Sequence, residues 1–306
     1  MNLRQISYFL AAAEMESVSG AARELGISQS AITSALQALE AEMGASLFAR
    51  HAKGIRLTHE GHQFLVHARR IISAVADARR AVGSRPDVMQ GDLNLGVTRM
   101  VSGYYLAELL ARFRRIFPKI DVHVVEDERT YLEHLLVNGE LDVGLVLVSN
   151  LRDRQALESE ILIRSPSRVW LPAGHPLLTR HVLSLAEMES EPMIMLSVDE
   201  LSETTTAYWH QAGLRPSTVL TTASVEAVRS LVGLGVGLAI LPDMAYRPWS
   251  LEGDKLEARE LSNTIPTIDV GLVWRRGAPL RPTARQFLDM CREFTPADAR
   301  KRPLGI

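Results

Sequence analysis

The chain has 306 residues, of which 46% are hydrophobic and 23% charged, so it is long enough for two or three compact units and too apolar to be disordered. Its longest apolar run, residues 231–241, is too short to cross a bilayer, and residues 1–16 lack the basic start and apolar core of a signal peptide. We therefore expect a cytoplasmic protein with no membrane partner.

Charge is distributed unevenly around a formal net charge of −2. Residues 1–90 hold ten basic and eight acidic side chains, whereas residues 91–306 hold 24 and 28. The excess of positive charge lies in the N-terminal part, where it suits a polyanionic partner.

The first expected element is an amphipathic helix over residues 2–15. Its apolar side chains recur at helical spacing and would close a small core over the helices that follow. They are Leu3, Ile6, Phe9, Leu10 and Ala13.

Residues 17–61 predict a short helix, a tight turn and a longer helix, which is the pattern of a helix-turn-helix. Ser19 is placed to cap the first helix and Ser28 the second, while Gly26 suits the turn between them. The second helix would bury a single stripe of apolar side chains. The stripe consists of Ile32, Leu36, Leu39 and Met43.

The opposite side of the second helix is polar. Gln29, Thr33 and Gln37 recur every four residues, and Ser30 and Ser34 lie beside them. Amides and hydroxyls can bond to base edges in the major groove, because Gln offers adenine both a donor and an acceptor and Ser or Thr can be either. We interpret these five side chains as base-reading candidates, and the alternative is an ordinary solvated helix face.

A basic cluster follows within seven residues. Arg50, His51, Lys53 and Arg56 surround Gly54, with an apolar pair on either side, and this pattern predicts a β-wing. Cationic side chains on a hairpin beside a recognition helix can neutralise phosphates, which fixes register without reading sequence.

These residues carry a family resemblance. The run AARELGISQSAITSALQALEAEMGASLF and the later RLT and EG resemble the winged helix-turn-helix of LysR-type transcriptional regulators, without a gap from residue 2 to about residue 82. Family members often have Pro, a basic residue and Pro where this chain has Ser30, Ser34 and His59. Residues 28–43 contain no Lys or Arg, so we do not expect an arginine on this helix to read guanine. The candidate DNA-binding residues are Ser28, Gln29, Ser30, Thr33, Ser34, Gln37, Arg50, Lys53 and Arg56.

A further helix is expected over residues 62–82, with a three-four apolar repeat broken only by Arg79. The repeat consists of Leu65, Ala68, Ile72, Val75 and Val82. It resembles the family's linker helix. The resemblance implies that two subunits pair antiparallel through this helix and place their two DNA-binding domains, called heads below, on one duplex. The alternative is packing against the chain's own C-terminal domain.

Residues 83–92 form a polar hinge with Pro86 and Gly91, which marks a domain boundary. Strands and helices then alternate, and near-continuous apolar strands predict a parallel sheet covered on both faces. The expected strands are 93–97, 120–126, 141–148, about 161–171, 193–196, 218–222, 235–241 and 268–274, and the expected helices are 103–117, 131–138, 201–212, 224–233 and 281–294.

The expected fold class is α/β overall. An all-α winged helix-turn-helix domain and a linker helix precede a two-lobed α/β domain that resembles the periplasmic-binding-protein-like effector domain of the same family. The expected domains are 1–60 for DNA binding, 61–90 for the linker helix and hinge, and 91–306 for effector binding, with lobe I at about 91–162 and 267–300 and lobe II at about 163–266.

In such sheets ligands bind at the carboxyl ends of strands, where helix N-termini expose unpaired N–H groups. Hydroxyls and two arginines at these positions suit a small carboxylate or a similar polar anion. The alternative for Arg99 and Arg129 is a surface salt bridge, for instance with Asp127 or Glu128. The effector-binding candidates are Thr98, Arg99, Ser102, Arg129, Ser149, Ser197 and Thr222.

Catalytic and metal patterns are weak. Gly233, Gly235 and Gly237 precede a strand instead of following one, which favours tight packing over a phosphate cradle. The histidines at 51, 59, 62 and 67 have no accompanying cysteine or paired carboxylates, so no metal and no cofactor is expected. The one cysteine, Cys291, lies in a helical pattern and is interpreted as a structural thiol in preference to a redox sensor.

The resemblance implies a ligand-responsive bacterial transcriptional regulator that is not an enzyme. Its implied partners are double-stranded DNA, a small-molecule effector and further copies of the chain, as a homodimer through the linker helix and as a homotetramer, and the resemblance leaves room for RNA polymerase. The alternatives are a solute sensor with a DNA anchor and a nucleoid architectural protein.

Overall fold

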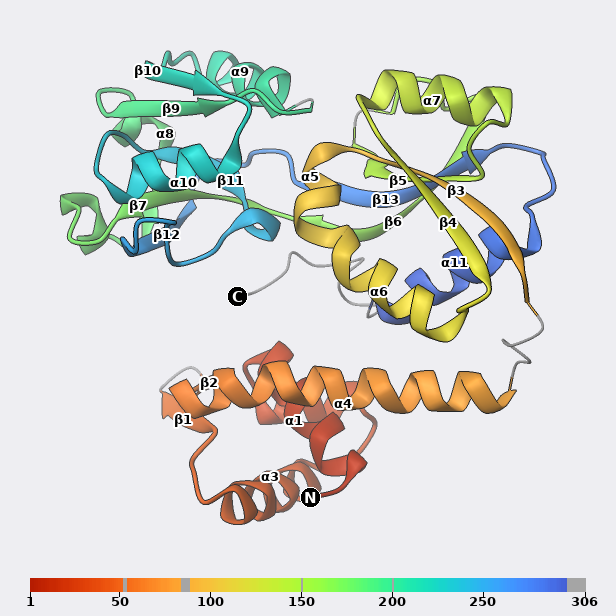
Figure 1. The fold of residues 1–306 in the computed structure, drawn as a ribbon. Coiled ribbons are helices and arrows are strands. Elements are labelled where there is room, and N and C mark those ends of the chain that lie inside the picture. Colours follow the sequence, from red (N-terminus) through yellow and green to blue (C-terminus); the bar gives the residue numbers. More distant parts are fainter. Residues whose placement is uncertain (52–53, 84–88, 150, 200, 296–306) are drawn as a thin grey trace. The chain divides into compact units, whose positions relative to one another are not determined.

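The computed structural model describes residues 1–51, 54–83, 89–149, 151–199 and 201–295. The chain divides into two compact units, Met1–Pro86 and Asp87–Leu304. Figure 1 shows the course of the chain through both. Among the described residues, no helix has both the length and the apolar character needed to cross a membrane.

The first unit is helical apart from one hairpin. Its elements are α1 (Leu3–Met15), α2 (Val18–Glu24), α3 (Gln29–Met43), the strands β1 (Phe48–His51) and β2 (Gly54–Leu57), and α4 (His59–Gly83). Asn2 caps α1 in a capping box with Gln5, and Ser17 caps α2. The predicted cap Ser19 is therefore wrong, because the helix begins one residue before it.

The core of this unit joins α1, α2, α3 and part of α4. Phe9 lies at its centre and contacts the rings of Phe48 and Phe64, whose centroids are 5.2 and 4.9 Å away. The predicted stripes hold in the middle of each helix and fail at the ends, since Leu3 and Met43 are exposed. A terminal turn has neighbours on fewer sides, so an apolar residue there can remain in contact with water.

The second unit contains two lobes. Lobe I is built from β3 (Gly91–Val97), α5 (Arg99–Val101), the π-helix η2 (Ser102–Leu106), α6 (Ala107–Ile116), β4 (Ile120–Glu126), α7 (Arg129–Asn138), β5 (Val143–Leu147), β6 (Leu157–Ser165), β13 (Ile268–Arg275) and α11 (Pro282–Phe294). Its sheet has the order β4-β3-β5-β13-β6. Helix α7 covers one face, and α6 and α11 cover the other (Figure 1).

The sheet of lobe I is mixed, which corrects the predicted parallel sheet. Strands β4, β3 and β5 are parallel, whereas β13 pairs antiparallel with both β5 and β6. Strand β13 enters from lobe II and not from a covering helix on lobe I, so it runs opposite to its neighbours. The expected helix over 103–117 also begins earlier, because α5, η2 and α6 form one helical segment from Arg99 to Ile116.

Lobe II is built from β7 (Ser167–Pro172), the 3₁₀-helix η3 (Pro176–Thr179), β8 (Val182–Leu183), α8 (Leu185–Met188), β9 (Pro192–Leu196), α9 (Leu201–Gln211), β10 (Ser217–Thr222), α10 (Val225–Gly233), β11 (Ala239–Pro242), the 3₁₀-helix η4 (Asp243–Ala245) and β12 (Leu256–Leu261). Its strands have the order β11-β7-β12-β8, with the pair β10-β9 joined to β11 by a bridge between Met193 and Leu238. The expected strand over 161–171 is two strands, since Pro166 interrupts it where the chain passes between the lobes.

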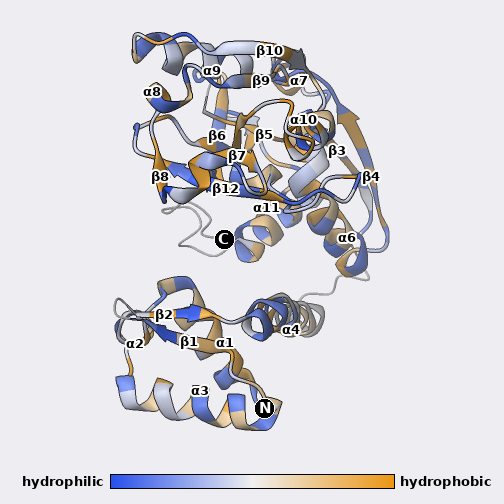
Figure 2. Ribbon diagram, turned by 90° about the vertical axis from the view of Figure 1, so that its left-hand side faces the viewer, coloured by the Kyte–Doolittle hydropathy of each residue, from blue (hydrophilic) through white to orange (hydrophobic). Residues whose placement is uncertain are grey.

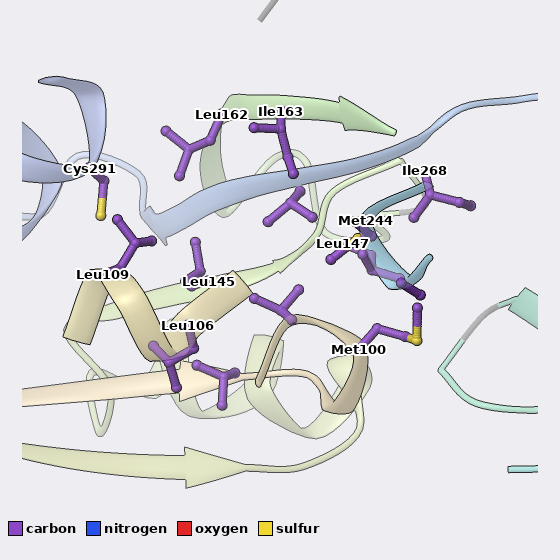
Figure 3. Close-up of a cluster of buried hydrophobic side chains, with 14 of the residues drawn as sticks. Met100, Leu106, Leu109, Leu145, Leu147, Leu162, Ile163, Met244, Ile268 and Cys291 are labelled. Carbon is purple, nitrogen blue, oxygen red and sulfur yellow. The ribbon is translucent and has the colours of Figure 1, made fainter. Parts of the chain in front are cut away.

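Alternating side chains of β7 serve two cores. Trp170 packs toward α10, while Val169 and Leu171 pack toward α8 and α9. In Figure 2 the interior strands are largely hydrophobic, and hydrophilic residues lie along the outer faces of the helices. Figure 3 shows that Met244 of lobe II lies among Leu147 and Ile268 of lobe I, so one apolar cluster spans both lobes.

Candidate nucleic-acid and effector sites

Helix α3 presents the predicted polar face. Ser28 caps the helix, and its hydroxyl accepts the Ala31 N–H at 3.3 Å. Gln29, Ser34 and Gln37 are exposed: Ser34 and Gln37 lie on the side away from the buried stripe, and Gln29 is the first residue of the helix. The positive φ of Gly26, 65°, makes the turn that brings α2 and α3 together. The face is therefore held by a packed and capped helix.

Not all of the predicted base-reading side chains are equally available. The half-buried Thr33 donates its hydroxyl proton to the Gln29 carbonyl at 2.9 Å, and the Ser30 hydroxyl is 3.1 Å from that of Ser28. Such local bonds are common for short hydroxyl side chains in helices. The two glutamines and Ser34 are exposed, so their polar groups are accessible to a partner.

The wing, defined here as β1 and β2, is an antiparallel hairpin. Its register pairs Ala49 with Arg56 and Arg50 with Ile55. Because directly opposed residues share a face and successive residues alternate, Arg50 and Arg56 lie on opposite faces of the hairpin. Both are exposed, as is His51. Lys53 lies outside the described residues.

The predicted linker helix is present as α4. Ala68 is fully buried, and Leu65 and Ile72 are half-buried against the core of the first unit, so part of the apolar repeat is used within this unit. The side chain of Val82 lies outside what the structure describes, as do residues 84–88 of the predicted hinge, and Gly91 and Asp92 at its end belong to β3.

Thr98 and Ser102 lie where β3 ends and the helical segment of lobe I begins. Thr98 is fully buried and sits at the N-cap position, yet its hydroxyl has no hydrogen-bond partner among the residues that the structure describes. The Ser102 N–H donates to the Thr98 carbonyl at 2.8 Å, and Arg99 is exposed. A buried hydroxyl without a partner costs free energy, so this position is suited to a ligand or a water.

Two hydrogen bonds that the sequence did not suggest join lobe II to this segment. The Asp199 carboxylate accepts the Met100 N–H at 3.0 Å. The Tyr104 hydroxyl donates to Glu226 Oε1 at 2.7 Å. Burial and the bond to Glu226 raise the pKa of Tyr104 to about 12, while the Arg229 guanidinium lowers the pKa of Glu226. The start of the segment is therefore already held by a carboxylate.

Ser149 joins two strands of lobe I. Its hydroxyl accepts the Asp269 N–H at 3.1 Å, and the Asp269 side chain is bonded to Thr267 at 2.7 Å and to Arg164 at 3.0 Å. Ser197 and Thr222 lie together in lobe II, where the Ser197 N–H donates to the Thr222 carbonyl at 2.8 Å. Ser197 is exposed and Thr222 is half-buried.

Arg129 is a correction. It is buried with 3% of its surface exposed, and it forms an ion pair with Glu133 on the next turn of α7. Glu133 also accepts the Asp153 N–H at 3.1 Å. Arg129 therefore stabilises the packing of α7 through its ion pair with Glu133. The i, i+4 spacing of Arg129 and Glu133 is the signal that could have predicted this pair.

Packing accounts for Gly237. A Cβ on Gly237 would lie 2.7 Å from the Pro192 carbonyl oxygen, so this glycine allows close packing of two strands. Among the described residues, no three His, Cys, Asp or Glu side chains are grouped so as to hold a metal ion.

The two units match two family models. Residues 3–62 match the bacterial regulatory helix-turn-helix protein, lysR family, and residues 86–296 match the LysR substrate binding domain. The chain belongs to the LysR family of transcriptional regulators. It is accordingly a DNA-binding, ligand-responsive regulator and not an enzyme.

Full-length relatives agree with this assignment. The chain is 26% identical to the DNA-binding transcriptional dual regulator OxyR of Escherichia coli K12 over 293 residues, which cover 95% of each chain. It is 29% identical to the crystal structure of HinK, a LysR family regulator of Pseudomonas aeruginosa, with a TM-score of 0.61 over 95% of this chain and 97% of that one. Full-length CbnR complexed with its target DNA shares the fold, with a TM-score of 0.56, 22% identity and coverage of 96% and 100%.

Proposed function

We propose that the chain controls transcription by reading operator DNA with α3 and by sensing a small polar anion, such as a carboxylate, at the strand ends of its two-lobed domain. The observation that carries the first part is the geometry of α3, a capped helix with a buried stripe, where Ser34 and Gln37 are exposed on the side away from the stripe and Gln29 is exposed at the N-terminal end. Amide and hydroxyl groups on such a face can bond to adenine and to other base edges.

The wing supplies the charge that α3 lacks. Helix α3 contains no Lys or Arg, whereas Arg50 and Arg56 are exposed on the two faces of the adjoining hairpin. Phosphate contacts release counterions and hold the protein in register. We therefore assign sequence reading to α3, with Ser28, Ser30 and Thr33 in supporting contacts, and phosphate binding to the wing.

The effector proposal is supported by the buried hydroxyl of Thr98, which has no hydrogen-bond partner among the described residues. Ser102, Ser149, Ser197 and Thr222 provide further hydroxyls near the ends of β3, β5, β9 and β10. A carboxylate is matched by hydroxyl donors and backbone N–H groups. Arg99 is exposed and could approach such a ligand, whereas Arg129 is not proposed.

Assembly and location follow from the same proposal. Two copies paired through α4 would place two heads on one duplex, which raises the effective concentration of the second head. A homotetramer and a contact with RNA polymerase would extend this arrangement. A protein that reads operator DNA works in the cytoplasm.

Peroxide sensing is a weaker second candidate. Its support is the name of several relatives, such as the hydrogen peroxide-inducible genes activator of Pectobacterium carotovorum, which is 26% identical over 294 residues. This chain has one cysteine, and Cys291 is fully buried in α11. A single buried thiol forms no intramolecular disulfide and reacts slowly with oxidants, so a metabolite anion is favoured.

The test separates base reading from phosphate binding. We expect Gln29→Ala to weaken operator binding by about 1–3 kcal/mol with little change on a random duplex, because it removes a base contact. We expect Arg56→Ala to weaken both complexes. The slope of log affinity against log salt is negative, and we expect its magnitude to decrease by about one because one phosphate contact is lost. The measurement is a salt titration of duplex binding.

Gln211→Ala, an exposed glutamine at the end of α9, is the matched control and should bind both duplexes as the wild type does. Equal losses for Gln29→Ala on operator and random duplexes would refute the assignment of base reading to α3.

A further inference from the structure

Glu40 connects the recognition helix to the wing. It lies on α3, three residues beyond Gln37, and a single carboxylate oxygen accepts two successive backbone N–H groups, Leu47 at 2.7 Å and Phe48 at 3.0 Å. These two residues lead into β1. Hydrogen bonds to an ionised acceptor are roughly twice as strong as neutral ones, so the start of the wing is firmly tied to α3.

The rest of the hairpin is fastened from other directions. The Thr58 N–H donates to the Leu47 carbonyl at 3.0 Å. The Ile55 N–H donates at 3.0 Å to the carbonyl of Glu16, which lies in the turn after α1. A Cβ on Gly54 would lie 2.4 Å from that carbonyl oxygen. Of these attachments, Glu40 is the one that comes from the helix carrying the base-reading face.

The wing depends on such attachments because it is small. Two strands of four residues do not form a stable hairpin in water by themselves. Their packing to the head decides where Arg50 and Arg56 lie relative to Gln29 and Gln37. A shift of the hairpin would place the cations out of register with phosphates while the bases remained in register with α3.

The charge of Glu40 makes its role testable. A carboxylate on a DNA-binding face repels phosphates, so a passive surface glutamate would weaken binding and its removal would strengthen it. Glu40 is half-buried, and its oxygen faces backbone donors. The geometry therefore favours a gain from positioning over the electrostatic cost.

We propose that Glu40 is a positioning residue for DNA binding, which holds the wing so that its arginines meet phosphates while α3 meets bases. The inference rests on the proposed phosphate-binding role of the wing. It concerns the wing's placement and not a direct contact of Glu40 with DNA.

The experiment uses the full chain with three substitutions at Glu40, each titrated with salt on operator and random duplexes. Glu40→Ala removes both hydrogen bonds, and we expect affinity for both duplexes to fall about tenfold or more, with a lower salt slope. Glu40→Asp keeps the charge but is one methylene too short, and should show the same direction of change. Glu40→Gln keeps an oxygen in place and should retain most of the affinity and the salt slope.

Glu42→Gln is the matched control, because it removes a charge from the same helix at an exposed position and should bind DNA as tightly as the wild type or more tightly. Thermal unfolding shows which variants keep a folded head. If Glu40→Ala does not fold, the DNA binding of Glu40→Asp tests the positioning role in its place. Wild-type affinity and salt slope in a folded Glu40→Ala or Glu40→Asp would overturn the inference.

Arg56→Ala separates this failure from that of the proposed function. If Arg56→Ala lowers the salt slope while Glu40→Ala does not, the wing binds phosphates and Glu40 does not position it. If Arg56→Ala changes nothing, the proposed role of the wing is refuted, and the inference about Glu40 with it.

Discussion

Thr98 and Arg129 both lie close behind a strand of lobe I, but burial has opposite consequences for them. Arg129 shares its buried position with Glu133, and removing one partner of such a pair typically costs 3–5 kcal/mol. Thr98 has no partner among the described residues, so an incoming ligand could satisfy its hydroxyl. The sequence predicted that both residues follow a strand. It did not predict their burial, because burial depends on the helices that cover them.

Tyr104 offers a prediction about pH. Its hydroxyl donates to Glu226, and its pKa is raised to about 12 from an ordinary value of 10.0 by burial and by that bond. A pKa that is higher in the folded chain gives stability that is present below pH 10 and is lost as pH rises from 10 toward 12. We expect Tyr104→Phe to lower the free energy of unfolding by about 0.5–1.5 kcal/mol at pH 7 and to remove this part of the alkaline loss.

Urea unfolding at several pH values measures the effect. Tyr131→Phe is the control, because Tyr131 is 50% exposed and should unfold as the wild type does at each pH. An unchanged alkaline slope in Tyr104→Phe would contradict the prediction.

At the level of elements, the helices of the first unit could be predicted closely, whereas the sheet of lobe I could not. Caps and apolar spacing are local, so Ser28 and the stripe at Ile32, Leu36 and Leu39 were visible in the sequence. The direction of β13 depends on where the chain returns from lobe II. Local residue patterns do not predict that point of return. Strands β8 and β12 also escaped prediction, because β8 has only two residues and β12 has one buried residue followed by mostly half-buried positions with no two-residue alternation.

The first turn of α4 tests how closely elements pack. A Cβ on Gly61 would lie 2.1 Å from the Leu47 carbonyl oxygen, which is backbone and cannot swing aside. We expect Gly61→Ala to destabilise the first unit by about 1–3 kcal/mol through overpacking. Thermal unfolding followed by circular dichroism measures the loss.

Gly103 provides the comparison, because a Cβ there would meet nothing within 4 Å and alanine favours helices. We expect Gly103→Ala to be neutral or slightly stabilising. Equal stability of the two variants would show that the first turn of α4 can move away from Leu47.

In the whole effector-binding unit, the lobes are tied on both sides of one helical turn. Asp199 accepts the Met100 N–H, and Tyr104 donates to Glu226 four residues later. Between them begins the π-helix, an irregularity that often marks functional sites. These contacts link residues about a hundred positions apart, so sequence spacing gave no sign of Asp199 or Glu226.

Removing the Asp199 carboxylate should loosen this junction. We expect Asp199→Ala to speed hydrogen exchange of the amides at 100–106 by about tenfold or more, since a charge-assisted bond is lost. Small mono- and dicarboxylates that bind at the strand ends should slow exchange of the same amides in the wild type. Hydrogen exchange with mass spectrometry measures both effects.

Asp127→Ala is the matched control, because the Asp127 carboxylate accepts the Glu128 N–H at 2.7 Å within lobe I. It should leave exchange at 100–106 unchanged. If the two variants exchange alike, Asp199 does not restrain the lobes.

The solitary thiol of α11 also has a practical value. Cys291 is sealed in the interior, and the sequence has no other cysteine. A cysteine introduced at an exposed position on each lobe would therefore be available to spin or fluorescent labels while the native one stays unlabelled. Distances between two such labels would report how far the lobes separate when a metabolite binds, without first stripping the chain of its own sulfhydryl.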